Sequence, residues 1–315
     1  MKNFKLWDKV LGLVVFAIAM VTYGLTIEPT ASFWDCPEFI TTAFKLEVGH
    51  PPGAPFFMLT GKFFSLFASD PTQVAYCINM LSAFLSALTI LFLFWTITLL
   101  AKRMIVGKGS EISLAQSIVI LGSGLVGSLA YTFSDTFWFS AVEAEVYAYS
   151  SFLTAIVFWL ILKWEEKADE AGSDKYLILI TYLMGLSIGV HLLNLLTIPA
   201  IVLVYYFRKY EASIKGTIIA LLVSFAILVF VLYGLIPGFI SLAGYVELLF
   251  VNTLGLPFNS GALFYCLLTV GVLILSILEL YKEKVNFTLI KISSLLAICL
   301  MVLPFIMGNL WIGLF

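Results

Sequence analysis

Long apolar runs separated by short polar segments dominate this chain. A run of about 20 apolar residues is long enough to cross the hydrocarbon core of a bilayer as a helix. The pattern predicts nine such spans, at residues 10–27, 74–100, 114–133, 144–164, 176–189, 191–207, 216–236, 261–281 and 292–311. We therefore expect an all-α fold, a multi-pass membrane helix bundle.

Three stretches depart from this regular pattern. Residues 52–68, interrupted by Pro55 and Gly61, predict a short interfacial or re-entrant helix. Residues 237–260 contain several prolines and glycines, which predict a membrane-surface loop with a short amphipathic piece. Residues 176–207 are few for two crossings, so the sequence predicts two short helices that meet at a turn lining a water-filled cavity.

The composition supports the membrane assignment. Hydrophobic residues make up 62% of the chain and charged residues 11%, whereas roughly a quarter of a soluble domain is charged. The first apolar run has no small-residue cleavage site of a signal peptide, so we interpret it as a retained helix. The four cysteines have neither metal-ligand nor disulfide-framework spacing.

The distribution of basic residues predicts the orientation. With a cytoplasmic amino terminus, 15 of the 17 basic residues lie on the cytoplasmic side, and only Lys45 and Lys62 lie outside. The outer segments then carry nine acids: Glu28, Asp35, Glu38, Glu47, Asp70, Asp135, Glu143, Glu145 and Glu247. The basic residues form small membrane-flanking clusters, so nucleic acid is not an expected partner.

The first outer loop gathers the strongest candidates for chemistry. Asp35 and Glu38 are three residues apart, so a helical turn places both carboxylates on one face. The pair could bind a metal, or one carboxylate could take a proton from an acceptor hydroxyl while the other orients it. Alternatively, the two acids cap a short surface helix that has Pro37 in its first turn.

Histidines and acids in the other outer segments are weaker candidates. The stiff sequence from His50 to Gly53 could hold His50 rigidly in a cleft, or it could be a hinge. Glu143 and Glu145 lie at the start of the fourth span, where the helix dipole favours carboxylates, and their spacing lets at most one face a shared site. His191 lies at the turn between the two short helices, where a packed polar role is commoner than catalysis.

Several motifs together resemble a known family. Residues 28–57, 140–147, 185–194 and 254–261 are similar, in this order, to motifs of a bacterial membrane family once known only as an uncharacterised domain. That family is similar to the vertebrate transmembrane protein O-mannosyltransferases of the GT-C superfamily. The resemblance covers nearly the whole chain.

The resemblance implies a GT-C glycosyltransferase fold with a site formed by the outer loops. It implies that Asp35 is the catalytic base or positions the acceptor, that Glu38 assists, and that His50 and Glu145 occupy matching motif positions. The donor would be a sugar carried on a polyprenyl phosphate. A carboxylate base helps a serine or threonine hydroxyl to attack the anomeric carbon, and this single displacement inverts the anomeric configuration.

The expected function is therefore transfer of a sugar, with mannose favoured, to a protein hydroxyl on the non-cytoplasmic face. The bacterial resemblance implies an inner-membrane protein with a periplasmic site. Lys62 is the better of the two outer cations for the lipid phosphate, and a divalent cation is left open. Glu145, His50 and His191 are expected to line the same outer cavity as Asp35. Asn194 and Lys62 are expected, with these three, to bind substrate.

Two alternatives come from other classes of protein. A transporter or flippase of a lipid-linked substrate would show internal repeats and charges near mid-membrane, and neither is clear here. A catalytically inactive scaffold is the third interpretation. We expect residues 1–315 to form one transmembrane module, and a truncated carboxyl terminus is left open because the last predicted span ends close to Phe315.

Overall fold

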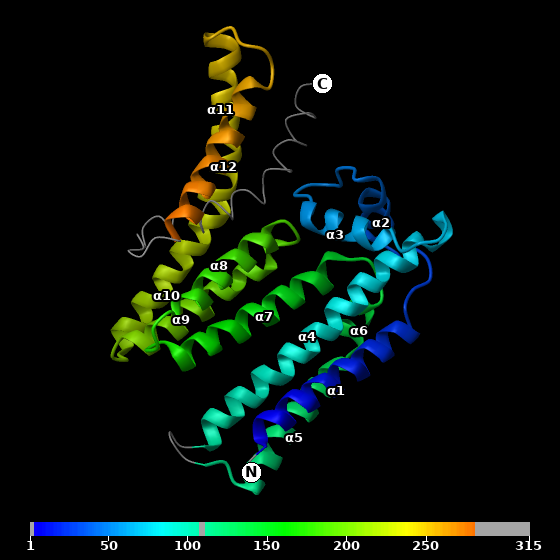
Figure 1. Ribbon diagram of the computed structural model, residues 1–315, viewed down its shortest axis with the longest axis vertical. Coiled ribbons are helices and arrows are strands. Elements are labelled where there is room, and N and C mark those ends of the chain that lie inside the picture. The colour runs from blue at the N-terminus through cyan, green and yellow to red at the C-terminus, as the bar shows by residue number, and fades with distance from the viewer. Residues whose placement is uncertain (1–2, 107–110, 281–315) are drawn as a thin grey trace. The chain divides into compact units, whose positions relative to one another are not determined.

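The computed structural model describes residues 3–106 and 111–280 (Figure 1). The described residues form helices and no strand, which confirms the all-α prediction. They divide into two compact units, the first ending at Lys167 and the second beginning at Ala168.

The first unit is built around one long helix. It contains α1 (Phe4–Leu25), α2 (Cys36–Lys45), α3 (Pro55–Ser65), α4 (Val74–Ile105), α5 (Leu114–Thr132), α6 (Asp135–Ala141) and α7 (Val146–Lys167). The central helix α4 contacts α1, α5 and α7, and Figure 1 shows these four as long, roughly aligned helices. An added Cβ on Gly124 of α5 would lie 2.6 Å from Thr98 Cγ2, so a glycine is what lets α5 approach α4 so closely.

The short helices α2 and α3 pack against each other at one end of this bundle. The backbone of Gly61 approaches Ala43 so closely that an added Cβ would lie 2.9 Å from the Ala43 Cβ. Pro55 occupies the first turn of α3, where the missing N–H costs no helical hydrogen bond. The predicted short helix within residues 52–68 is therefore present, and it continues through Gly61.

The α1–α2 and α6–α7 connections meet at that same end. The backbone N–H of Glu28 donates to the Val142 carbonyl at 3.1 Å. Asn79, in the second turn of α4, donates its side-chain amide to the carbonyls of Glu28 (2.7 Å) and Thr30 (2.9 Å). The first two outer loops of the sequence prediction are therefore joined by a backbone hydrogen bond, and Asn79 fastens the first of them to α4.

The second unit starts with two short helices. Its elements are α8 (Asp174–Ile188), a 3₁₀ segment (Leu192–Thr197), α9 (Ile198–Lys209), α10 (Ile214–Val229), α11 (Ile236–Leu248) and α12 (Ser260–Leu280). The chain turns at residues 189–191, between α8 and the 3₁₀ segment. The prediction of two short helices that meet near this point is confirmed.

The predicted surface loop at residues 237–260 was wrong over most of its length. A π-helical turn, Phe230–Leu235, joins α10 to α11, and a second, Leu249–Thr253, extends α11, so that one helical stretch runs from Ile214 to Thr253. Pro237 falls in the first turn of α11, directly after a π-helical turn, where its missing N–H is tolerated. The connection from the end of this stretch to α12 comprises only residues 254–259.

Five described helical stretches are long and apolar enough to cross a membrane. They are Pro71–Ile105, Leu114–Thr132, Val146–Lys167, Leu192–Lys209 and Ile214–Thr253. Helix α8, at 15 residues, is shorter than a usual span. The span predicted at residues 292–311 lies outside the described part. The apolar helices indicate a membrane protein.

Candidate functional site

Asp35 stands at the amino end of α2, as the helix-capping interpretation required. Its side chain, however, makes no capping hydrogen bond, whereas Pro37 does occupy the first turn of the helix. Capping therefore explains Pro37 and leaves the Asp35 carboxylate available for another role.

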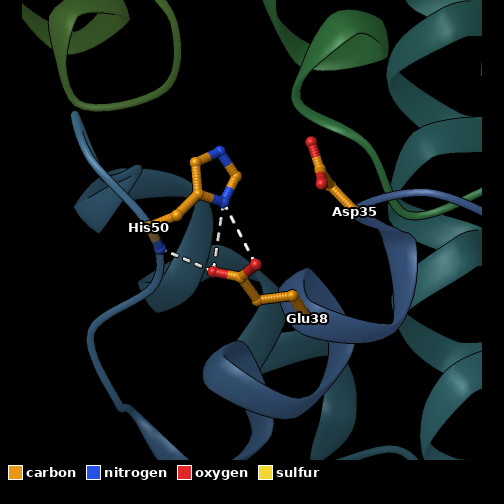
Figure 2. A group of neighbouring side chains, drawn as sticks. All are labelled: Asp35, Glu38 and His50. Carbon is orange, nitrogen blue, oxygen red and sulfur yellow. Dashed lines mark hydrogen bonds and ion pairs between the residues drawn. The ribbon is translucent and has the colours of Figure 1, made fainter.

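Glu38 and His50 are joined by hydrogen bonds (Figure 2). Glu38 Oε1 accepts from the backbone N–H of His50 at 2.6 Å, and the His50 Nδ1 lies 3.1 Å from both carboxylate oxygens. The backbone hydrogen bond from His50 is the largest cause that lowers the pKa of Glu38. A carboxylate partner at Nδ1 favours the tautomer with its proton there, which leaves Nε2 as an acceptor.

The loop that presents His50 depends on two glycines. The N–H of Gly53 donates to the His50 carbonyl at 2.9 Å, and Gly53 has a φ of 76°, which glycine adopts without strain. A Cβ on Gly49 would lie 2.9 Å from Glu38 Oε1. Glycine at positions 49 and 53 therefore lets this proline-rich segment hold His50 against α2.

Asp35, Glu38 and His50 together form a set of possible metal ligands. One ligand atom from each lies within 4.8 Å of the others, and all three side chains are at least partly exposed. Two carboxylates and one imidazole are donors that suit a transition-metal cation and leave positions open for a substrate. The residues therefore fit a divalent cation in donor type and spacing.

The two acids before α7 are buried, which the sequence did not predict. Glu143 is 6% exposed and Glu145 is 4% exposed. Burial is the main cause that raises the pKa of Glu145 to about 7, and the negative charges of Glu143 and Asp35 raise it further. Glu145 therefore lies within electrostatic range of Asp35. Stabilisation by the helix dipole does not account for this burial.

Ser32 and Cys36 lie beside these acids, and both were missed as site residues. Burial raises the pKa of Glu143, and a hydrogen bond with Ser32 opposes that effect. Cys36 is buried, which raises the pKa of its thiol, and the charges of Glu143 and Glu145 raise it further. The place of Ser32 and Cys36 inside the first-loop motif is the signal that could have identified them.

Lys62 points to a neighbouring helix end. Its ammonium donates to the Phe44 carbonyl at 2.5 Å and lies 4.7 Å from the centroid of the Phe44 ring. This contact connects α3 to the last turn of α2. Binding of a lipid phosphate by Lys62 stays a prediction.

His191 and Asn194 belong to the second unit. The His191 Nδ1 accepts from the backbone N–H of Leu193 at 3.1 Å, so the ring caps the 3₁₀ segment. Asn194 is fully buried, and its carbonyl accepts from the Thr197 hydroxyl at 2.7 Å. The structure thus gives both residues local partners, and their participation in the Asp35 site stays a prediction.

Comparisons with known proteins are consistent with this first-loop site. Residues 35–214 match the family model described as the protein O-mannosyl-transferase TMEM260 N-terminal domain. The matched range begins at Asp35 and also includes Glu38, His50, Glu145 and His191. No solved structure matches the chain.

Two curated relatives carry the same name. The chain is 24% identical over 201 residues to "Protein O-mannosyl-transferase tmem260" of Dictyostelium discoideum, covering 62% of this chain and 22% of that protein. It is 26% identical over 178 residues to "Protein O-mannosyl-transferase TMEM260" of Mus musculus, covering 56% of this chain and 23% of that protein. The match thus spans less than a quarter of either relative. Since the family model covers more than half of the present sequence, the chain belongs to the protein O-mannosyl-transferase TMEM260 N-terminal domain family.

Proposed function

We propose that this protein is a membrane glycosyltransferase of the GT-C type. It transfers a sugar, with mannose favoured, from a polyprenyl-phosphate donor to a serine or threonine hydroxyl of a protein. The observation that carries the proposal is that the Asp35 carboxylate makes no helix-capping hydrogen bond and lies beside the Glu38–His50 pair. These residues lie in the segment where the family match begins. The names of the relatives support the reaction class.

In the proposed reaction, Asp35 acts as the general base. Its carboxylate accepts the proton of the acceptor hydroxyl while the hydroxyl oxygen forms a bond to the anomeric carbon. The bond from that carbon to the donor phosphate breaks, and the polyprenyl phosphate leaves with the bonding electrons. Attack from the face opposite the leaving group inverts the anomeric configuration.

Glu145 would serve as the acid counterpart of Asp35. Because its pKa is raised to about 7, it binds a proton more readily near neutral pH than an ordinary glutamate does. A protonated carboxyl can donate a hydrogen bond to a sugar hydroxyl, whereas an ionised Asp35 can accept a proton. A carboxyl group whose pKa is raised by burial suits the acid role.

The Glu38–His50 pair has two possible parts in this reaction. With its proton held at Nδ1 by Glu38, His50 can orient the acceptor hydroxyl through Nε2. Alternatively, Glu38, His50 and Asp35 hold a divalent cation, which would offset the charge of the donor phosphate. We further propose that Lys62, His191 and Asn194 contact the donor or the acceptor.

The topology proposed for this reaction follows the distribution of basic residues. The site containing Asp35 would face the non-cytoplasmic side, which is the periplasm if the protein resides in a bacterial inner membrane. A lipid-linked sugar presented on that side would reach the acceptor without entering the cytoplasm.

A transfer assay tests the proposed function. The purified protein in lipid nanodiscs is incubated with polyprenyl-phosphate mannose, or another polyprenyl-phosphate sugar, and a serine- and threonine-containing peptide, with and without chelator. Sugar-modified peptide supports the enzyme, and loss of transfer on chelation that a divalent cation restores supports the metal site. Movement of the intact donor across liposomes without cleavage would instead establish a transporter or flippase. If the protein neither transfers the sugar nor moves the donor, the scaffold interpretation is supported.

A further inference from the structure

A second candidate site lies at the other end of the first unit. An open cavity of about 590 Å³ is lined by residues of α1, α4 and α7. Its lining includes five lysines: Lys5, Lys9, Lys102, Lys163 and Lys167. Along α4, Lys102 is separated from Asn79, which binds the first outer loop, by roughly 35 Å of helix. This distance is close to the thickness of a bilayer hydrocarbon core.

The floor of this lysine cavity is aromatic and apolar. Trp95 and Trp159 line it, with their ring centroids 5.9 Å apart, and Leu99 adds an aliphatic surface. The indole N–H of Trp95 donates to the Asp8 carbonyl at 3.3 Å, which fixes the ring against α1. Tryptophan commonly marks the level of lipid headgroups in membrane proteins. The cavity therefore joins a cationic rim to an apolar floor.

The lysines outnumber the acids that could neutralise them. The cavity is lined by two carboxylates, Asp8 and Glu166, against the five lysines. Glu166 is paired with Lys163. Within the described residues, Lys5, Lys9 and Lys102 form no salt bridge. Three excess positive charges therefore favour an anionic ligand.

Asp8 supplies a hydrogen-bond acceptor among these cations. Its side chain interacts with Thr98, and Lys163 and Lys102 lie within electrostatic range. The Asp8 Oδ1 atom is buried and makes no hydrogen bond within the described residues. A bare phosphate would be repelled by this carboxylate. A phosphate ester that also carries a hydroxyl could donate to it.

We infer that the lysine cavity binds a hydroxyl-bearing phosphate ester, with the phosphate on Lys9 and Lys102 and the hydroxyl on Asp8. Clusters of lysines at a membrane surface attract lipid phosphates, each contributing a charge-assisted contact. The chemistry is shared by a lipid headgroup such as phosphatidylglycerol and by a soluble ester such as glycerol phosphate. This site is separate from the Asp35 site and does not depend on the proposed transferase activity.

Binding to the purified full chain tests this inference. The protein in neutral detergent is titrated with phosphatidylglycerol, with phosphatidylcholine or with glycerol 3-phosphate, and bound ligand is counted by native mass spectrometry. Lys9→Gln/Lys102→Gln should weaken phosphatidylglycerol binding roughly thirtyfold, from about five- to sixfold for each lost lysine contact. Lys9→Arg/Lys102→Arg should keep the binding.

A matched control removes two charges elsewhere. Lys175→Gln/Lys215→Gln changes the net charge equally, at two lysines that do not line the cavity. Binding of phosphatidylglycerol that is lost only in the cavity variant supports a lipid ligand, and tighter binding of glycerol 3-phosphate supports a soluble one. Equal losses in both double variants, or equal retention of phosphatidylcholine and phosphatidylglycerol, would overturn the inference.

Discussion

His50 contacts the carboxylate of Glu38 through both its backbone and its ring. The backbone N–H lies 2.6 Å from Oε1, and Nδ1 lies 3.1 Å from each oxygen. Because the two contacts come from one residue, the proline-rich loop and the ring cannot move independently of α2. The pair therefore presents Nε2 in a fixed direction beside Asp35, and its geometry depends on how closely the loop approaches Glu38.

Gly49→Ala should disturb this geometry without removing a functional group. The new Cβ would lie 2.9 Å from Glu38 Oε1, so the flexible carboxylate must move away from His50. We expect sugar transfer to fall by about tenfold or more, because small misplacements of catalytic groups are costly. Gly24→Ala is the control, since a Cβ there meets nothing within 4 Å. Equal activity of the two variants would show that the Glu38–His50 contact is dispensable.

Asp35→Asn should abolish most of the turnover. The amide has nearly the same size but cannot accept the hydroxyl proton, so the rate should fall by roughly 10² to 10⁴. Glu47→Gln removes an exposed acid of the same loop and should transfer sugar normally. Initial rates in nanodiscs, normalised to correctly folded protein, give the comparison. Wild-type turnover in Asp35→Asn would remove Asp35 from the catalytic role.

Glu145 should make the stability of the protein depend on pH. Its carboxyl has a pKa of about 7 in the fold against 4.5 for an ordinary glutamate. As pH rises from about 4.5 to 7, the unfolded chain releases this proton first, so the free energy of unfolding falls and then levels off above 7. The loss is at most about 3.5 kcal/mol, at roughly 1.4 kcal/mol for each unit of pKa between 4.5 and about 7.

Glu145→Gln should reduce that pH dependence. The neutral amide cannot ionise, so the thermal midpoint should fall less between pH 4.5 and 7.5 than it does in the wild type. Burial also raises the pKa of Glu143. Part of the dependence of the thermal midpoint on pH should therefore remain in Glu145→Gln. Glu47→Gln should retain the full wild-type slope. An unchanged slope in Glu145→Gln would contradict the raised pKa.

The pattern of apolar residues predicted the long helices of the first unit well. The apolar run that begins at residue 74 and the run at residues 114–133 match α4 and α5 closely, because run length determines where a spanning helix begins and ends. Asp35, Glu38 and His50 were also identifiable, because all three lie within one short loop.

Contacts between distant segments could not be predicted in the same way. The burial of Glu143 involves Ser32, more than a hundred residues earlier, and nothing beside Glu143 indicates that partner. The helix through Pro237 needs π-helical turns, which prolines and glycines do not signal locally. Glu247 was counted as an outer acid. Its hydrogen-bond partners, Asn259 and Ala262, lie at and beyond the end of a turn at residues 254–259 whose bounds the sequence did not predict.

Glu247→Gln should loosen the connection between α11 and α12. The buried carboxylate accepts from the backbone N–H groups of Asn259 (2.6 Å) and Ala262 (2.8 Å). A glutamine offers one acceptor oxygen in place of two charged ones, so we expect a loss of roughly 1–3 kcal/mol. Faster amide hydrogen exchange at these two positions would report the loosening. Glu211→Gln, an exposed control, should leave their exchange unchanged.

Opposite ends of the first unit should lie on opposite sides of the membrane. Helix α7 extends from Val146, next to Glu145, to Lys167, a length of roughly 30 Å. In a chain without native cysteines, Glu47→Cys should react with a membrane-impermeant maleimide added to intact cells, because the basic residues predict an outer first loop. Lys167→Cys should react only after the membrane is permeabilised. The reverse pattern would place Asp35 on the cytoplasmic side and would exclude the proposed site of transfer.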